Sequence, residues 1–136
     1  MSQFMIAVVA VVTLVGTVDA QQRRLVAPVR GEAVIEYTKP ATKVSANEVV
    51  TVIRVKNVNS APIAGLRIEE NWYAGGNPVG GDTYRHPRPL PPDAVIEVTL
   101  STPRRPGMSS PQYVFTHANG TIKPQLVGKL ELTPVP

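Results

Sequence analysis

Hydrophobic and polar residues alternate along several stretches of this chain, with the period of a β-strand. The clearest stretch is Glu48–Val58 (EVVTVIRVKNV), in which Val49, Ile53 and Val55 share one face and polar residues take most of the other. Period-two alternation with β-branched residues is typical of a half-buried strand. We therefore predict a strand here, with its apolar face turned to a core.

Five further stretches have strand-like composition, and Pro, Gly and Asn residues separate them. Leu66, Ile68 and Trp72 share the apolar face of one stretch, where we expect Trp72 to pack in the core. Glu70 falls on that same face, so we expect it near an edge or paired with a cation. The Gly-rich piece that follows, 75–81, is predicted as a hairpin bend. The further strands are predicted over residues 32–38, 65–74, 94–101, 112–118 and 121–133.

A hairpin is predicted between the last two strands, at Asn119-Gly120. Both central residues of a two-residue type I′ turn need a positive φ, which Asn and Gly tolerate best. No window after Ala20 has a sustained helical period, and the chain's fourteen prolines would interrupt one. The pattern predicts an all-β fold, an antiparallel immunoglobulin-like β-sandwich of about seven strands over residues 31–136.

The N-terminus is predicted to be an apolar helix that directs export. Residues 4–18 carry no charge, and Val18-Asp19-Ala20 resembles a signal peptidase site. The segment 1–20 is then either a signal peptide cut after Ala20 or a membrane anchor that holds the protein through residues 4–20. Either way we expect a bacterial periplasmic or extracellular protein, with 21–30 as an extended tail.

The amino-acid composition excludes some classes of functional site and partner. The absence of cysteine excludes disulfide scaffolds and thiolate sites. The net charge of +4 comes from interspersed basic residues, which favours a soluble surface. Attraction to anionic lipid or to a cell-wall surface is a weaker alternative. Basic residues are not interleaved with aromatic ones in any nucleic-acid-binding motif, so we expect no nucleic-acid partner.

Candidate chemistry is sparse. A metal site would need His86 and His117 to meet, with Asp82 as a third ligand. A hydrolase triad would need Ser109, His117 and Asp93, which no motif connects. We expect both histidines at the surface and predict no catalytic residue, no metal and no cofactor. A sugar-stacking role for Trp72 is the less favoured alternative to core packing.

Two basic, proline-dense loops are candidate partner-binding segments: 85–92 (RHPRPLPP) and 103–111 (PRRPGMSSP). Stiff loops of this kind lose little entropy on docking. If both lie at one end of the domain, their arginines form a positive surface for an acidic partner. These arginines are Arg85, Arg88, Arg104 and Arg105.

The tail 21–30 is a second candidate surface, because Leu25, Ala27 and Val29 alternate as an added strand would. Pro28 limits such a strand to a sheet edge. The tail could complete the domain's own sheet, serve as a tether, or pair with a neighbouring subunit.

Part of the chain resembles small exported bacterial domains. Lys56-Asn57-Val58-Asn59-Ser60, a strand ending in Trp72-Tyr73, and Pro91-Pro92-Asp93 before another strand are similar to the FxLYD-type immunoglobulin-like domains. At the family's signature positions only Tyr73 matches. The resemblance implies a β-sandwich with an interaction or structural role.

From these patterns we expect a non-catalytic interaction or structural module of the bacterial envelope whose partner is another envelope protein. Two alternatives stay open. The first is a membrane-anchored accessory subunit of a larger membrane complex, for example for electron transfer or export. The second is a carbohydrate- or polymer-binding domain.

Overall fold

The structure, a computed structural model, describes residues 26–133 and shows an all-β fold without a helix in that range. Among the residues so described, no helix is long and apolar enough to cross a membrane. The predicted N-terminal helix lies outside this range. Eight strands follow one another along the chain: β1 (Ala33–Thr38), β2 (Ala41–Val44), β3 (Glu48–Asn57), β4 (Arg67–Ala74), β5 (Asn77–Arg85), β6 (Val95–Pro103), β7 (Ser109–His117) and β8 (Gly120–Val127).

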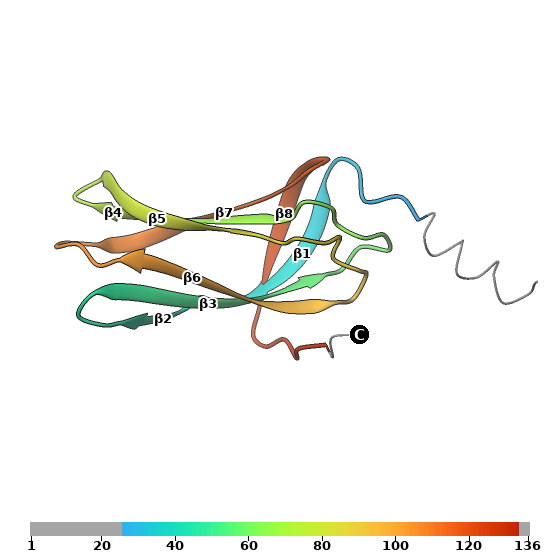
Figure 1. Ribbon diagram of the computed structural model, residues 1–136. Coiled ribbons are helices and arrows are strands. Elements are labelled where there is room, and N and C mark those ends of the chain that lie inside the picture. The colour runs from blue at the N-terminus through green and yellow to red at the C-terminus, as the bar shows by residue number, and fades with distance from the viewer. Residues whose placement is uncertain (1–25, 134–136) are drawn as a thin grey trace, which may run out of the picture.

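The strands form one mixed sheet that curls on itself. Its order is β2-β3-β1-β8-β7-β4-β5, and β6 pairs with β3. In Figure 1, β4, β5 and β7 form the upper layer, β2, β3 and β6 form the lower layer, and β1 and β8 run across between the layers. The pair β1–β8 is parallel. The prediction of a purely antiparallel fold is therefore wrong at this pair, which joins strands from opposite ends of the domain.

Alternating positions of the strands fill the space between the layers, as the sequence pattern predicts. Trp72 is among the buried residues, with 6% of its surface exposed. This burial confirms its predicted core packing and leaves no exposed indole face for a sugar. The core cluster consists of Ala33, Ile35, Ile53, Val55, Ile63, Leu66, Ile68, Leu90, Val98, Leu100 and Phe115.

Glu70 departs from its predicted place. It lies in β4, between β5 and β7, and is only 1% exposed. The Tyr113 hydroxyl donates to its Oε2 at 2.8 Å, and the Thr102 hydroxyl donates to its Oε1 at 3.3 Å. The expectation of a sheet edge or a cationic partner is therefore wrong: hydroxyl donors, one of them from β6 in the facing layer, satisfy the carboxylate.

Several predictions of strand boundaries need correction. The short strand β2 and most of β5 were not predicted, because β2 is exposed at every residue and β5 contains Pro78, Gly80 and Gly81. The bend predicted over 75–81 is confined to Gly75-Gly76. The last strand ends at Val127 rather than Thr133.

Beyond β8 the chain crosses to β6 and is held there. Arg54 donates to the Leu130 carbonyl at 2.8 Å, and the Val95 amide donates to the Thr133 hydroxyl at 3.1 Å. Leu130 is buried. Leu130, which is part of the pattern that suggested a longer strand, thus helps to dock this segment.

β7 and β8 separate soon after their turn. They pair at Thr116–Thr121 and His117–Gly120, after which β8 pairs with β1. No strand of the described chain pairs with the outer edge of β7 from Ser109 to Phe115. Where β7 and β8 have separated, the Tyr37 and Phe115 rings pack with their centroids 5.1 Å apart. This aromatic pair covers the core between β1 and β7.

Candidate functional site

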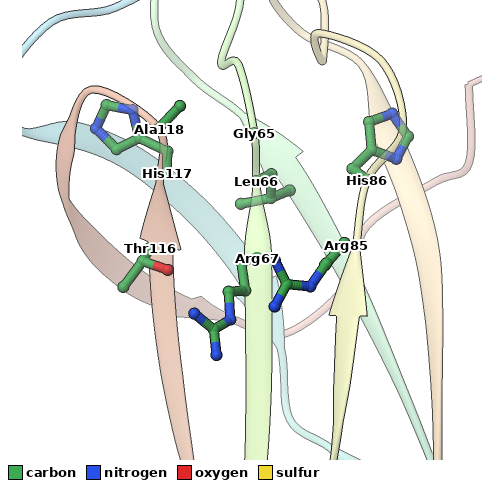
Figure 2. A pocket seen from close by; sticks show the side chains of 8 residues that line it. All are labelled: Gly65, Leu66, Arg67, Arg85, His86, Thr116, His117 and Ala118. Carbon is green, nitrogen blue, oxygen red and sulfur yellow. The ribbon is translucent and has the colours of Figure 1, made fainter.

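A shallow depression with a volume of about 380 Å³ lies where β4 begins and β5 and β7 end. Figure 2 shows the eight residues around it. Its ionisable lining residues are two arginines and two histidines, and no carboxylate side chain lines it. The lining residues are Gly65, Leu66, Arg67, Arg85, His86, Thr116, His117 and Ala118.

Two arginines face each other across neighbouring strands in this depression. Arg67 on β4 and Arg85 on β5 are direct partners in the sheet register, and Figure 2 shows the Arg85 side chain reaching from β5 toward Arg67. Like charges at directly opposed positions destabilise a sheet. Glu69 forms an ion pair with Arg67, whereas Arg85 has no ion-pair partner within residues 26–133.

The Arg67 side chain keeps a further unused donor. Its Nε atom is buried and has no hydrogen-bond partner in the described part of the chain. A buried donor without an acceptor is costly, since it has lost its hydration without replacement.

His86 borders the depression as a neutral ring. Burial, and then the positive charge of Arg88, lower the pKa of His86 below its ordinary value. The Tyr84 hydroxyl lies 2.8 Å from its Nδ1, and burial raises the pKa of that hydroxyl. The Tyr84 hydroxyl therefore keeps its proton at neutral pH and shares a hydrogen bond with the neutral imidazole. At neutral pH, the arginines carry the positive charge of this site.

His117 is buried, so the expectation that both histidines lie at the surface is wrong for this residue. Its Nε2 lies 2.7 Å from the Gly31 carbonyl oxygen and donates to it. The Asn119 amide contacts its Nδ1 at 3.4 Å. With both ring nitrogens engaged, His117 joins the β7–β8 turn to the segment before β1 and has a structural role.

Two asparagines, Asn57 and Asn59, fix the loop that carries Arg88. Asn57 is fully buried and donates through Nδ2 to the carbonyls of Ala61 and Leu90, at 3.0 and 2.8 Å. Asn59 in turn donates to the Asn57 side chain and to the Val34 carbonyl. These bonds hold the β3–β4 and β5–β6 connections and β1 together. They explain the Asn57-Val58-Asn59 motif, whose role the sequence pattern did not reveal.

The four predicted arginines do not form one surface. Arg85 and Arg88 lie at the end where β4 starts, whereas the loop of Arg104 and Arg105 lies near the end of β4, where Gly107 approaches Ala74. The eight-residue β4 separates the two groups by about 23 Å of strand, as Figure 1 also shows for the two loops. The hypothesis that both loops lie at one end of the domain is wrong. Because β5 and β6 run in opposite directions, the loops that follow them emerge at opposite ends.

The described part of the tail is docked but is not a strand. The Val29 amide donates to the Pro62 carbonyl at 2.9 Å, and Val29 packs against the core. Ala27 is exposed, and Leu25 lies outside the described residues. The tail thus contacts the β3–β4 connection close to the depression, and residues 26–30 add no strand to the sheet.

The structure does not bring together the residues considered for a hydrolase triad or for a metal site. Asp82 accepts a hydrogen bond from the Ser101 amide of β6 at 2.8 Å. Ser109 and His117 occupy opposite ends of β7, so β7 itself keeps them apart. Within residues 26–133, no three side chains of His, Asp or Glu are grouped to hold a metal ion.

Comparison with the solved structures gives a distant likeness. No family model matches the sequence, and no curated protein matches it. The structure is similar to that of IrmA from Escherichia coli, with 13% sequence identity and a TM-score of 0.47, over 75% of this chain and 99% of that one. No family model supports the resemblance to FxLYD-type domains, and the likeness to IrmA gives no information on function.

Proposed function

We propose that the protein is a non-catalytic interaction module that binds an acidic segment of another envelope protein. The contact surface is its cationic end, which we define as Arg67 and Arg85, the depression that they line, and Arg88 in the adjoining loop. The observation that carries this proposal is the directly opposed pair Arg67–Arg85. Such a pair destabilises the sheet of the unbound protein. Carboxylates of a partner would neutralise both arginines and stabilise the complex.

The form of the cationic end supports a protein partner. The depression is shallow and lies between strand ends, and the stiff loop of Arg88 adjoins it. Guanidinium groups bind carboxylates through two parallel hydrogen bonds, so a short acidic segment suits the spacing of neighbouring strands.

We also propose that the fold is a variant of the immunoglobulin-like sandwich. The chain passes from one layer to the other between β3 and β4, returns between β5 and β6, and passes back between β6 and β7. This alternation is a feature of Greek-key sandwiches. An experimental structure in which β5 and β6 pair along their length would instead make the fold a closed barrel.

Export remains part of the proposal, on the evidence of residues 1–20 alone. We propose a periplasmic or extracellular protein that is either free or anchored as an accessory subunit of a membrane complex. Mass spectrometry of the native N-terminus separates these forms. A chain that begins at Gln21 supports the free form, and an intact N-terminus in the membrane fraction supports the anchored one. An intact N-terminus in the cytoplasm would overturn export.

Binding of a labelled oligoglutamate peptide, measured by fluorescence anisotropy at low salt, tests the function. The double variant Arg85→Gln/Arg88→Gln is expected to bind the peptide about tenfold more weakly. Its matched control is Arg104→Gln/Arg105→Gln, which removes the same charge from the opposite end. Equal weakening in both variants would mean a general charge effect and would overturn the proposal. Tight binding of anionic vesicles with no binding of the peptide would favour a lipid surface instead.

A further inference from the structure

A second cavity lies at the end of the molecule away from the cationic end. Its volume is about 260 Å³, and it forms where the β6–β7 loop folds over Trp72. Val49 and Met108 supply further apolar lining, and Arg104 and Arg105 contribute to the same wall. Apolar walls with a few polar groups are the usual composition of a small-molecule site.

The indole of Trp72 is an unsatisfied donor in this place. The residue is 94% buried, and its Nε1 has no hydrogen-bond partner among the described residues. Buried tryptophan nitrogens usually find an acceptor. Both strands that flank β4 are irregular at Trp72 and Tyr73, where each inserts an extra residue. Such bulges redirect side chains and occur often beside functional sites.

Hydrogen bonds preform the loop that closes the cavity. Arg104 donates from its backbone to the Asn47 carbonyl at 3.0 Å and from its guanidinium to the Ser45 carbonyl at 3.3 Å. The Arg105 amide contacts the Met108 sulfur at 2.9 Å. Neither arginine forms an ion pair within residues 26–133. The wall therefore keeps a net positive charge, which an anion can neutralise.

We infer that this cavity binds a small aliphatic carboxylate. Its apolar part lies against Val49, Trp72 and Met108, and its carboxylate accepts hydrogen bonds from Arg104 and Arg105. This inference is independent of the proposed function, because the site lies at the opposite end of β4 and uses other arginines.

Trp72 is the chain's single tryptophan, so its indole N–H gives one resonance in a ¹H–¹⁵N spectrum and its fluorescence reports one site. Octanoate is added to the full chain and followed by both signals, with octanol as the uncharged control. We expect a saturable shift of the indole resonance with octanoate, a fluorescence change over the same concentrations, and binding of octanol weaker by about tenfold. No saturable change, or equal binding of octanol, would overturn the inference.

The double variant Arg104→Gln/Arg105→Gln is expected to weaken octanoate binding about tenfold, while Arg85→Gln/Arg88→Gln leaves the Trp72 response unchanged. Circular dichroism establishes that both variants are folded. The variant Met108→Ala, which removes apolar lining but no charge, should weaken octanoate and octanol alike. Unchanged octanoate affinity in Arg104→Gln/Arg105→Gln would show that the guanidinium groups do not bind the carboxylate.

Discussion

At the scale of single residues, Glu70 is a carboxylate at a position where the alternation of β4 predicts an apolar side chain, and hydroxyl donors around it compensate for its burial. A carboxylate on an apolar strand face is unfavourable unless donors reach it. Tyr113 is its partner across β4 and β7, and Thr102 comes from β6. Alternation along one strand predicts that Glu70 points inward, but it contains no information on a hydroxyl from a strand that lies 32 residues farther along.

The variant Tyr113→Phe is expected to lower the free energy of unfolding by about 1–3 kcal/mol, because it removes the closer donor to a buried carboxylate. Urea denaturation at neutral pH measures this change. Tyr37→Phe, in β1, is the control, because within residues 26–133 the Tyr37 hydroxyl donates to no carboxylate. Equal stability of Tyr113→Phe and the native chain would show that the Glu70 carboxylate does not depend on this bond.

The same residue predicts a dependence of stability on pH. Burial, and then the hydrogen bond to Glu70, raise the pKa of Tyr113 above its ordinary value. The unfolded chain therefore ionises this phenol at about pH 10, where the folded chain does not. The contribution to stability is complete below that pH and is lost as the pH rises through and above it. Denaturation between pH 8 and 11 should show a smaller decline in Tyr113→Phe than in the native chain.

Arg85 is expected to lower the stability of the free protein and to strengthen its binding of an acidic partner. The variant Arg85→Gln removes the like-charge opposition with Arg67, and the free energy of unfolding should rise by about 0.2–1 kcal/mol at low salt. Oligoglutamate binding should weaken in the same variant. Thermal denaturation and anisotropy measure the two effects. A loss of stability together with unchanged binding would show that Arg85 has a structural role only.

At the scale of elements, the last hairpin was located correctly, but its turn was not. The two-residue loop is Ala118-Asn119, and Gly120 already belongs to β8. Asn119 is not among the residues with positive φ, so the predicted type I′ turn is wrong. Gly120 is needed for another reason: a Cβ there would lie 2.2 Å from the Gly31 carbonyl oxygen, and its φ is +155°.

The variant Gly120→Ala is therefore expected to lower the free energy of unfolding by about 1–3 kcal/mol, since the Gly31 segment must move away. Gly128→Ala is the matched control, because a Cβ there meets nothing within 4 Å. Chemical denaturation of the two variants compares them. If both lose the same stability, the close approach of Gly31 to the turn is not what requires glycine.

The strands that the sequence predicts well are those with one buried face. β3 lies within one residue of its predicted range, and its buried residues alternate along its length. β2 and β5 were missed or shortened because exposed residues and glycines carry no periodic signal. The parallel pairing of β1 with β8 was not predictable, because nothing local in either segment specifies a partner from the other end of the chain.

At the scale of the whole molecule, topology decides which charges act together. The sequence predicted Arg85 and Arg88 as partner-binding residues, but it placed Arg104 and Arg105 with them and omitted Arg67. The register of β4 with β5 brings Arg67 to Arg85, and the reversal of direction between β5 and β6 separates the two loops. A pattern read along one chain gives neither result, because both depend on which strands pair.

The central claim, that the cationic end binds acidic partners, is tested most directly by chemical-shift mapping. The ¹⁵N-labelled chain is titrated with unlabelled oligoglutamate peptide at low salt, and the shifted amides are assigned. The account predicts saturable shifts concentrated at Arg67, Arg85, His86 and Arg88, with little change at Arg104 and Arg105. Shifts concentrated around Arg104 and Arg105, or spread evenly over all basic residues, would contradict it.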